Sequence, residues 1–332
     1  MPRVSAREAK EWARDTMRGF FTSPMIPFDD KLAMDEGAVA RNVDTLLGIG
    51  VSGIGFGFSE PWHLSRAERL HSIDVFVEAV AGRAACYVHA TDHSAPETIG
   101  LIRRAQDAGA DAVMVWAPYE FAKSQESACE WFEYIAGETD IPFILYNTYH
   151  SGIKLSPESI ERISRLPAVC AVKNGVNEFT HTVAVAERVG DRVVVSEPLE
   201  EHLPAAIQYL DQQVLLGTTS VYLMQTPAYQ PIREYAELFW AGRRTEGWQA
   251  YHGLEPLREI WRDTYRVLWD TRHATHPVAL IKMWMDIIGM HGGPVRPPTP
   301  SLPEHAERYL RERLMTSGWL ERLCPPSAGA AG

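Results

Sequence analysis

A lysine at the end of an apolar run is the residue of this sequence with the clearest chemical potential. The run from Ala168 to Val172 has the composition of a buried strand, Lys173 follows without a turn, and Asn174-Gly175 then breaks the pattern. Burying an unpaired ammonium is costly, and the cost is relieved when the lysine pKa falls until the amine is neutral. A neutral amine can attack a carbonyl carbon and form a Schiff base. The alternative is a strand-end lysine whose ammonium reaches solvent.

Lysine usage across the chain supports the first interpretation. Only six of the 32 basic residues are lysines, so arginine carries most of the positive charge. Lys282 lies in VALIKMWMDIIGM, where apolar residues at helical spacing predict a packed helix with the lysine stem along its face. Four others have polar or loop-like surroundings that suit a solvated role: Lys10, Lys31, Lys123 and Lys154. A chemical role is therefore expected for Lys173.

Strand-like and helical segments alternate along the chain and must position this lysine. The strand candidates are FFTSPMIPF, GIGFGFS, ACYVHAT, AVMVWAP, PFILYN, VCAVKNG, RVVVSEP and QVLLGTTS. Amphipathic segments separate them, at 35–47, 66–80, 96–108, 127–137, 157–166 and 180–189. Eight such units predict a TIM (β/α)8 barrel, here over residues 1–224 with an N-terminal helical lead-in. Helical patterns alone follow, so residues 225–332 are expected to form a C-terminal helical extension with a frayed tail.

In a barrel of this type the chemistry lies at the carboxyl ends of the strands. We expect the polar groups at these ends to face one another across the barrel mouth, where a reactive lysine is tolerated. They are Lys173 on strand six, Tyr146 and Asn147 on strand five, Ser59 and Glu60 on strand two, and Thr218 and Thr219 on strand eight.

The arrangement resembles the family of Schiff-base lyases that includes N-acetylneuraminate lyase and dihydrodipicolinate synthase. It is nearer to the hydratase-aldolase type than to dihydrodipicolinate synthase itself. The resemblance covers nearly the whole chain. Its motifs are ILYN at 144–147, AVKNG at 171–175, APYEFAKSQES at 117–127 and GIGVSGIGFGFSEPWHLSRAER at 48–69.

The resemblance implies that Lys173 forms an imine with the keto carbon of pyruvate or a related 2-oxo acid, and that Tyr146 is the acid/base. A protonated imine is an electron sink, so a C–C bond beta to it can break or form through an enamine. Tyr146 could shuttle the proton to or from the oxygen if neighbouring groups lower its pKa. The alternative for Tyr146 is a core aromatic residue whose hydroxyl finds one partner.

Departures from the family pattern concern the second substrate. Phe58-Ser59 stands where the family has two threonines, which leaves Ser59 as the hydroxyl for the 2-oxo acid's carboxylate. TYHSGIK lacks the family's proline and the arginine that binds a second carboxylate. Aromatic and imidazole groups suit an apolar or aromatic aldehyde instead, although His150 is equally well read as a second acid/base or as a loop residue in water. The substrate-binding residues expected are Ser59, Phe58, Asn147, Tyr149, His150 and Thr218.

Composition excludes other classes of protein. A net charge of -11 argues against nucleic acid or an anionic membrane as the main partner. The N-terminal 21 residues lack the apolar core of a signal peptide, and no window approaches a membrane span, so a cytoplasmic location is expected. His63, His89 and His93 have no carboxylate at a useful spacing, so no metal is expected, and no cofactor. The expected assembly is a homo-oligomer, a dimer or a tetramer.

The sequence thus predicts a class I aldolase that makes or breaks a C–C bond between a 2-oxo acid such as pyruvate and an aldehyde. Three alternatives stay open. Two belong to the same family, namely a hydratase-aldolase of the benzylidenepyruvate type and a 2-oxo acid dehydratase. The third, from another class, is a non-catalytic barrel with a binding or regulatory role.

Overall fold

The computed structural model describes residues 4–57, 60–269, 277–302 and 304–325, and its centre is one sheet of eight parallel strands. Their order is β7-β6-β5-β4-β3-β2-β1-β8, so strands adjacent in sequence pair with each other and β8 pairs with β1. The result is a nearly closed barrel, which confirms the predicted (β/α)8 fold. The strands are β1 Gly19–Thr22, β2 Gly53–Phe56, β3 Ala85–His89, β4 Ala112–Val115, β5 Phe143–Thr148, β6 Val169–Gly175, β7 Val194–Ser196 and β8 Val214–Leu216.

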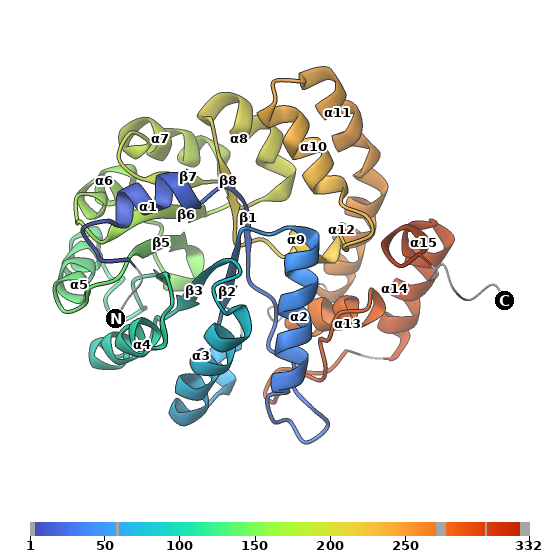
Figure 1. The fold of residues 1–332 in the computed structure, drawn as a ribbon, viewed down its shortest axis with the longest axis horizontal. Coiled ribbons are helices and arrows are strands. Elements are labelled where there is room, and N and C mark those ends of the chain that lie inside the picture. The colour runs from blue at the N-terminus through green and yellow to red at the C-terminus, as the bar shows by residue number, and fades with distance from the viewer. Residues whose placement is uncertain (1–3, 58–59, 270–276, 303, 326–332) are drawn as a thin grey trace. The chain divides into compact units, whose positions relative to one another are not determined.

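Helices alternate with the strands because the sequence supplies start and stop residues for them. The Asp35 carboxylate accepts a hydrogen bond from Ala38 N–H at the start of α2 (Glu36–Ile49), and Gly50 ends this helix with a φ of 82°. The other helices between strands are α3 Arg66–Val80, α4 Ala95–Ala108, α5 Gln125–Gly137, α6 Pro157–Ser164, α7 Phe179–Val189 and α8 Leu203–Leu210, with α1 Ala9–Thr16 before β1 (Figure 1).

Helices and loops make up the described chain after β8, as the sequence predicts. These helices are α9 Ser220–Leu223, α10 Pro231–Trp240, α11 Arg244–Gly253, α12 Glu255–Trp269, α13 Val278–Ile287, α14 Glu304–Thr316 and α15 Trp319–Leu323. Among the helices in the described ranges, none has both the length and the apolar character needed to cross a membrane.

The chain divides into two compact units. The first, here the barrel unit, comprises Met1–Ser23, Val51–Gly57 and Arg66–Thr218 and contains all eight strands. The second, the helical unit, comprises Pro24–Gly50, Phe58–Ser65 and Thr219–Gly332. Two segments that precede β3 in the sequence therefore group with the C-terminal helices. The domain boundary placed after residue 224 stays a prediction.

Side chains join the two edge strands, β7 and β8. Ser196 Oγ accepts a hydrogen bond from Leu216 N–H at 3.1 Å and donates one to the Val214 carbonyl at 3.0 Å. The Gln212 amide bonds in the same way to both backbone groups of Glu197, at 2.7 and 3.1 Å. These side-chain bonds lie at the position where backbone hydrogen bonds between β7 and β8 would otherwise close the barrel. We call Ser196 and Gln212 the seam.

Glycines on β2 make room for aromatic rings inside the barrel. A Cβ on Gly53 would overlap with the Phe21 ring, and one on Gly55 would overlap with the Tyr87 ring and with Ser23 Oγ. The interior next to β2 is therefore filled from β1 and β3.

A buried ion pair holds the helical unit together. Lys282 and Glu60 are each 1% exposed, and Lys282 Nζ lies 2.8 Å from the Glu60 carboxylate and 2.8 Å from the Pro294 carbonyl. Ile26 N–H donates to the other Glu60 oxygen at 2.8 Å. One expectation needs correction. Glu60 was expected to face the barrel mouth, but both of its carboxylate oxygens contact groups of the helical unit. The Lys282 side chain lies on its helix, and its ammonium is buried against this acid.

Removing the seam hydroxyl should destabilise the protein. Ser196 is fully buried, so Ser196→Ala leaves the Leu216 N–H and the Val214 carbonyl without this partner, at a cost of about 1–3 kcal/mol. The thermal midpoint from calorimetry should fall. Ser301→Ala, at an exposed position, is the control and should leave the midpoint unchanged. Equal midpoints for the two variants would mean that the seam bonds contribute nothing to stability.

Candidate active site

Strands β5 and β6 bring Tyr146 and Lys173 together inside the barrel. The two residues are direct partners in the register of the pair, and both side chains are buried, with exposed fractions of 6% and 3%. Lys173 Nζ lies 4.2 Å from the centre of the Tyr146 ring and donates a hydrogen bond to the Gly217 carbonyl at 2.9 Å. The predicted pair therefore shares one site, at the carboxyl ends of the strands.

Burial moves the two pKa values in opposite directions. It lowers the pKa of Lys173 to about 7, so a large fraction of the amine is neutral near pH 7. It raises the pKa of Tyr146 to about 12, and a hydrogen bond with the Thr148 side chain opposes the rise. The condition that neighbouring groups lower the Tyr146 pKa is not met, because desolvation dominates. The phenol is thus protonated at neutral pH and available first as an acid.

Two glycines give these side chains their space. Gly217 has a φ of 78°, and a Cβ there would lie 2.6 Å from Lys173 Nζ. A Cβ on Gly175 would lie 2.7 Å from Tyr146 Cε2. Any larger residue at either position would displace the amine or the ring. This role was not predicted from the sequence, although a glycine at the end of the QVLLGTTS strand, Gly217, was the available signal.

Aromatic rings continue from Tyr146 along the interior of the barrel. The Trp116 ring lies 5.8 Å from that of Tyr146, the His89 ring 6.4 Å from that of Trp116, and the Tyr87 ring 5.8 Å from that of His89. We call these four residues the aromatic arc. Ser23 Oγ lies 3.0 Å from the Tyr87 hydroxyl and 3.5 Å from His89 Nε2.

His89 is neutral within this arc. Burial first, and then the positive charge of Lys173, hold its pKa well below the usual range. From the sequence, His89 was weighed only as a metal ligand, a role that was rejected, and Tyr87 and Trp116 were not predicted. The alternation in CYVH, which places Tyr87 and His89 on one face of β3, was the available signal. Within the described residues, no group of three or more histidine, cysteine, aspartate or glutamate side chains could hold a metal ion.

The other predicted substrate contacts have different positions. The buried Asn147 amide donates to Asn174 Oδ1 at 2.8 Å and accepts from Leu155 N–H at 2.9 Å, so it braces the protein. Tyr149 is 53% exposed, with its hydroxyl on Glu178. Thr218 is half-buried directly after Gly217. Phe58, Ser59 and the His150 side chain lie outside the described residues. Substrate binding by these six residues stays a prediction.

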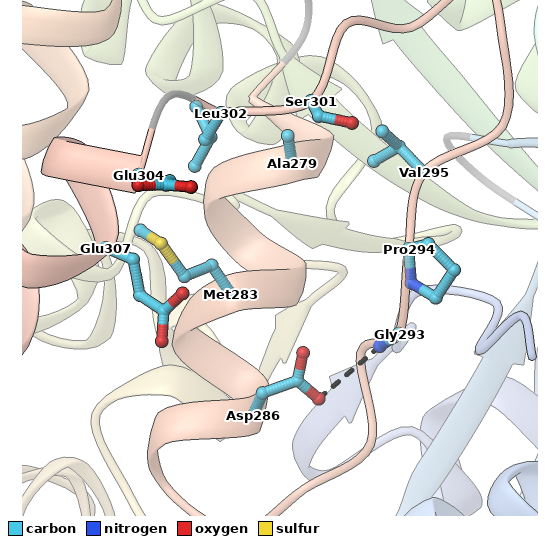
Figure 2. A pocket seen from close by; sticks show the side chains of 10 residues that line it. All are labelled: Ala279, Met283, Asp286, Gly293, Pro294, Val295, Ser301, Leu302, Glu304 and Glu307. Carbon is cyan, nitrogen blue, oxygen red and sulfur yellow. Dashed lines mark hydrogen bonds between the residues drawn. The ribbon is translucent and has the colours of Figure 1, made fainter. Parts of the chain in front are cut away.

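A separate hollow in the helical unit is a poor site for a 2-oxo acid. It has a volume of about 240 Å³ and lies between α13, the chain from Gly293 to Val295 and the start of α14 (Figure 2). Carboxylates of Asp286, Glu304 and Glu307 line it, beside apolar groups such as Met283. These carboxylates repel an anion, and none of the described residues that line the hollow is a lysine or an arginine, so the hollow supplies no amine for a Schiff base.

Comparisons with known proteins identify the family of the chain. The family model described as the dihydrodipicolinate synthetase family matches residues 16–235. The 4-hydroxy-tetrahydrodipicolinate synthase of Methanothrix thermoacetophila is 28% identical over 90% of this chain and 96% of its own length. The probable 5-dehydro-4-deoxyglucarate dehydratase of Bradyrhizobium diazoefficiens is 26% identical over 91% of this chain and 92% of its own length.

A solved structure shares the fold at lower identity. A prophage protein of the dihydrodipicolinic acid synthase family from E. coli K12, solved in complex with pyruvate, superposes with a TM-score of 0.79 at 21% identity. The match covers 92% of this chain and 99% of that protein. With its barrel, its buried lysine and a family match that spans residues 16–235, this chain belongs to the dihydrodipicolinate synthetase family.

Proposed function

We propose that the protein is a class I aldolase that joins a pyruvate-like 2-oxo acid to an apolar or aromatic aldehyde, or cleaves the product. Family membership supports an enzyme of the Schiff-base lyase or dehydratase type. The observation that carries the proposal is Lys173, a buried amine with a pKa of about 7 against the Tyr146 ring. Such an amine is a nucleophile at neutral pH.

The proposed reaction begins with imine formation. Lys173 Nζ attacks the keto carbon, and Tyr146 donates its proton to the oxygen that leaves as water. The Tyr146 phenolate then removes a proton from C3 of the protonated imine, and the electron pair gives an enamine. Enamine C3 bonds to the aldehyde carbon while Tyr146 returns the proton to the aldehyde oxygen. Water finally hydrolyses the protonated imine, which frees Lys173 as the neutral amine and returns a proton to the Tyr146 phenolate.

The aromatic arc supports an apolar or aromatic aldehyde. Trp116 lies edge-on to Tyr146 and is the ring next to the reacting pair. Burial of apolar surface contributes about 25 cal/mol per Å², so contact with one ring can favour binding by a few kcal/mol. Ser59 is proposed to hold the 2-oxo acid's carboxylate, with Phe58, Tyr149, His150, Asn147 and Thr218 around the substrates. A cytoplasmic dimer or tetramer is part of the same proposal.

A dehydratase is the second candidate, because a relative of nearly equal identity has that name. It would form the same imine at Lys173 but expel a hydroxyl group instead of breaking a C–C bond. Product analysis separates the two, since only the aldolase releases or consumes an aldehyde. A hydratase-aldolase would add water before it releases the aldehyde.

Borohydride should trap pyruvate on Lys173. Reduction of the imine adds a stable reduced pyruvyl group to the peptide that contains Lys173, which mass spectrometry identifies. Lys173→Arg should give no adduct, because the guanidinium keeps its charge. Lys10→Arg is the matched control, since the Lys10 pKa is also lowered by burial but Lys10 lies on α1 and bonds to the Ser164 carbonyl. An unmodified Lys173 at saturating pyruvate would refute the Schiff-base mechanism.

The same trap has a pH dependence whose sign follows from the lowered pKa. Below a pKa of about 7 the Lys173 amine is charged and unreactive, and above it the amine is neutral. The rate with cyanoborohydride should therefore rise between about pH 6 and pH 8 and then level off. A lysine with its ordinary pKa would give a rate that still rises at pH 9, contrary to this expectation.

Tyr146→Phe should slow turnover far more than it weakens binding of pyruvate. The ring stays beside Lys173, but the proton donor is lost, so kcat should fall by about 10²- to 10⁴-fold. Steady-state kinetics and pyruvate titration give the two quantities. Tyr134→Phe, at an exposed position on α5, is the control. If turnover stays within a few-fold, Tyr146 is a packing residue and His150 becomes the candidate acid.

With pyruvate as donor, benzaldehyde should have a higher kcat/KM than aspartate semialdehyde or N-acetylmannosamine in one competition assay. Trp116→Ala should erode this preference by about tenfold, because it removes the ring next to Tyr146, whereas Trp116→Phe should keep most of it. A wild-type preference for the semialdehyde or the sugar would remove the aromatic acceptor from the proposal.

A further inference from the structure

We propose that Glu178 sets the charge selectivity of the barrel mouth by masking Lys154, so that a reactant with a second carboxylate is disfavoured. This inference rests on the proposed function and adds to it a specificity-determining residue. It concerns the part of the reactant beyond the imine carbon. Glu178 touches neither Lys173 nor Tyr146 in the contacts described above.

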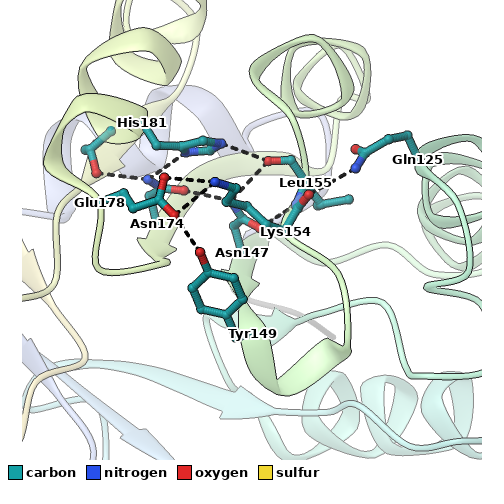
Figure 3. A network of polar contacts seen from close by, with 9 residues as sticks. Gln125, Asn147, Tyr149, Lys154, Leu155, Asn174, Glu178 and His181 are labelled. Atoms are coloured by element: carbon teal, nitrogen blue, oxygen red, sulfur yellow. Dashed lines mark hydrogen bonds and ion pairs between the residues drawn. The ribbon is translucent and has the colours of Figure 1, made fainter.

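The three residues of this cluster follow the strands that carry the reacting pair. Tyr149 and Lys154 belong to the segment after β5, the strand of Tyr146. Glu178 follows β6, the strand of Lys173, and precedes α7. Loops at the carboxyl ends of barrel strands surround the active site, so the cluster lies at the mouth rather than on an outer face. Figure 3 shows Tyr149 and Lys154 both directed at Glu178.

Glu178 is fully engaged by these two partners. Its carboxylate accepts from Lys154 Nζ at 2.9 and 2.8 Å and from the Tyr149 hydroxyl at 2.6 Å. It stands at the N-cap of α7, yet its side chain makes no capping bond to that helix. The Glu178 carboxylate instead accepts its hydrogen bonds from side chains of the loop after β5.

The pair is neutral as a unit at physiological pH. Hydrogen bonds from Lys154 and then Tyr149 lower the pKa of Glu178, and the bond to Glu178 raises the pKa of Lys154. Both groups are therefore charged and cancel each other. A carboxylate that approaches Lys154 must compete with Glu178 and is repelled by it.

The backbone of Lys154 is held independently of Glu178. Gln125 Nε2 donates to the Lys154 carbonyl at 3.0 Å. The next residue, Leu155, donates its N–H to Asn147 Oδ1 at 2.9 Å. Both anchors persist when the Glu178 charge is removed. Glu178→Gln should thus leave Lys154 in place as a partly exposed ammonium with no acid on it.

Three other basic side chains after barrel strands also have partners. They are Arg66 with Glu97 at 2.7 Å, Arg69 with Asp92 at 2.5 Å, and Lys123 over the Tyr119 ring at 3.4 Å. Cations with a side-chain partner are therefore a repeated feature of these connections. Glu178 differs because a single carboxylate controls both a cation and an aromatic residue, so one substitution unmasks the charge.

The test compares two 2-oxo acids that share the same reacting group, a keto carbon next to a carboxylate. Pyruvate and 2-oxoglutarate both present a keto carbon and a carboxylate to Lys173. The second carboxylate of 2-oxoglutarate is attached to C4, one carbon beyond C3, the atom that bonds to the aldehyde, so it extends toward the acceptor's place. Borohydride trapping on Lys173 gives a rate for each acid in wild type, Glu178→Gln, Lys154→Met and the double variant. Glu161→Gln is the matched control, because Glu161 on α6 pairs with Arg165 and Arg188.

Glu178→Gln should raise the 2-oxoglutarate rate relative to the pyruvate rate by about tenfold, since a charged hydrogen bond becomes available. The gain should shrink in high salt, because the site is partly exposed. It should vanish in the double variant and be absent in Glu161→Gln. The ratio of kcat/KM for 4-carboxybenzaldehyde to that for benzaldehyde should change in parallel.

Each other outcome is decisive. An unchanged ratio in Glu178→Gln, with normal pyruvate trapping, overturns the role of Glu178 and leaves the proposed function intact. A gain that survives in the double variant assigns the effect to a cation other than Lys154 and also overturns it. Failure of wild type to trap pyruvate refutes the Schiff-base proposal and the inference together.

Discussion

Burial of the Lys173 amine is the constraint on which the site depends. Desolvation disfavours the ammonium, and its strength depends on how little solvent and how little opposite charge the amine meets. The chain contains a second buried lysine for comparison. Burial lowers the pKa of Lys282 as well, but the Glu60 carboxylate opposes this fall and gives that ammonium an acidic partner. Lys173 Nζ instead meets the face of Tyr146 and the Gly217 carbonyl, which are weaker partners for a charge than a carboxylate.

The alternation of side chains along β5 and β6 places the reacting residues inside the barrel and the residues that support them on its outer face. Tyr146 and Lys173 face the interior, while the next residues on the same strands, Asn147 and Asn174, face outward and bond to each other at 2.8 Å. Thr182 on α7 accepts from Asn174 at 2.9 Å and donates to the buried Glu197 carboxylate at 2.6 Å. The outer layer thus fixes the spacing of β5 and β6, and with it the distance between amine and phenol.

The barrel and its reacting pair were predictable from the sequence because both depend on local patterns. Eight alternating units give the fold, and a lysine after five apolar residues stands out against any strand pattern. Contacts between distant residues were not predictable. Glu60 and Lys282 are adjacent only after folding, and the Tyr146 pKa depends on a burial that no local window contains. Trp116 was overlooked because a tryptophan at the end of an apolar strand is typical of a core residue.

The seam has a consequence for reactivity. Lys173 lies directly beside Ser196 in the register of β6 and β7, and its carbonyl partner Gly217 directly follows β8. The amine is therefore flanked by β7 and β8, which the seam side chains join to each other in the described part of the chain. Any local opening of β7 from β8 admits water to Lys173 before most of the barrel is disturbed. Hydration returns the amine to its ammonium form, which is not a nucleophile. The closed seam therefore acts as a barrier to hydration of Lys173. Hydrogen exchange of the Leu216 amide should report how often the seam opens and the amine becomes protonated.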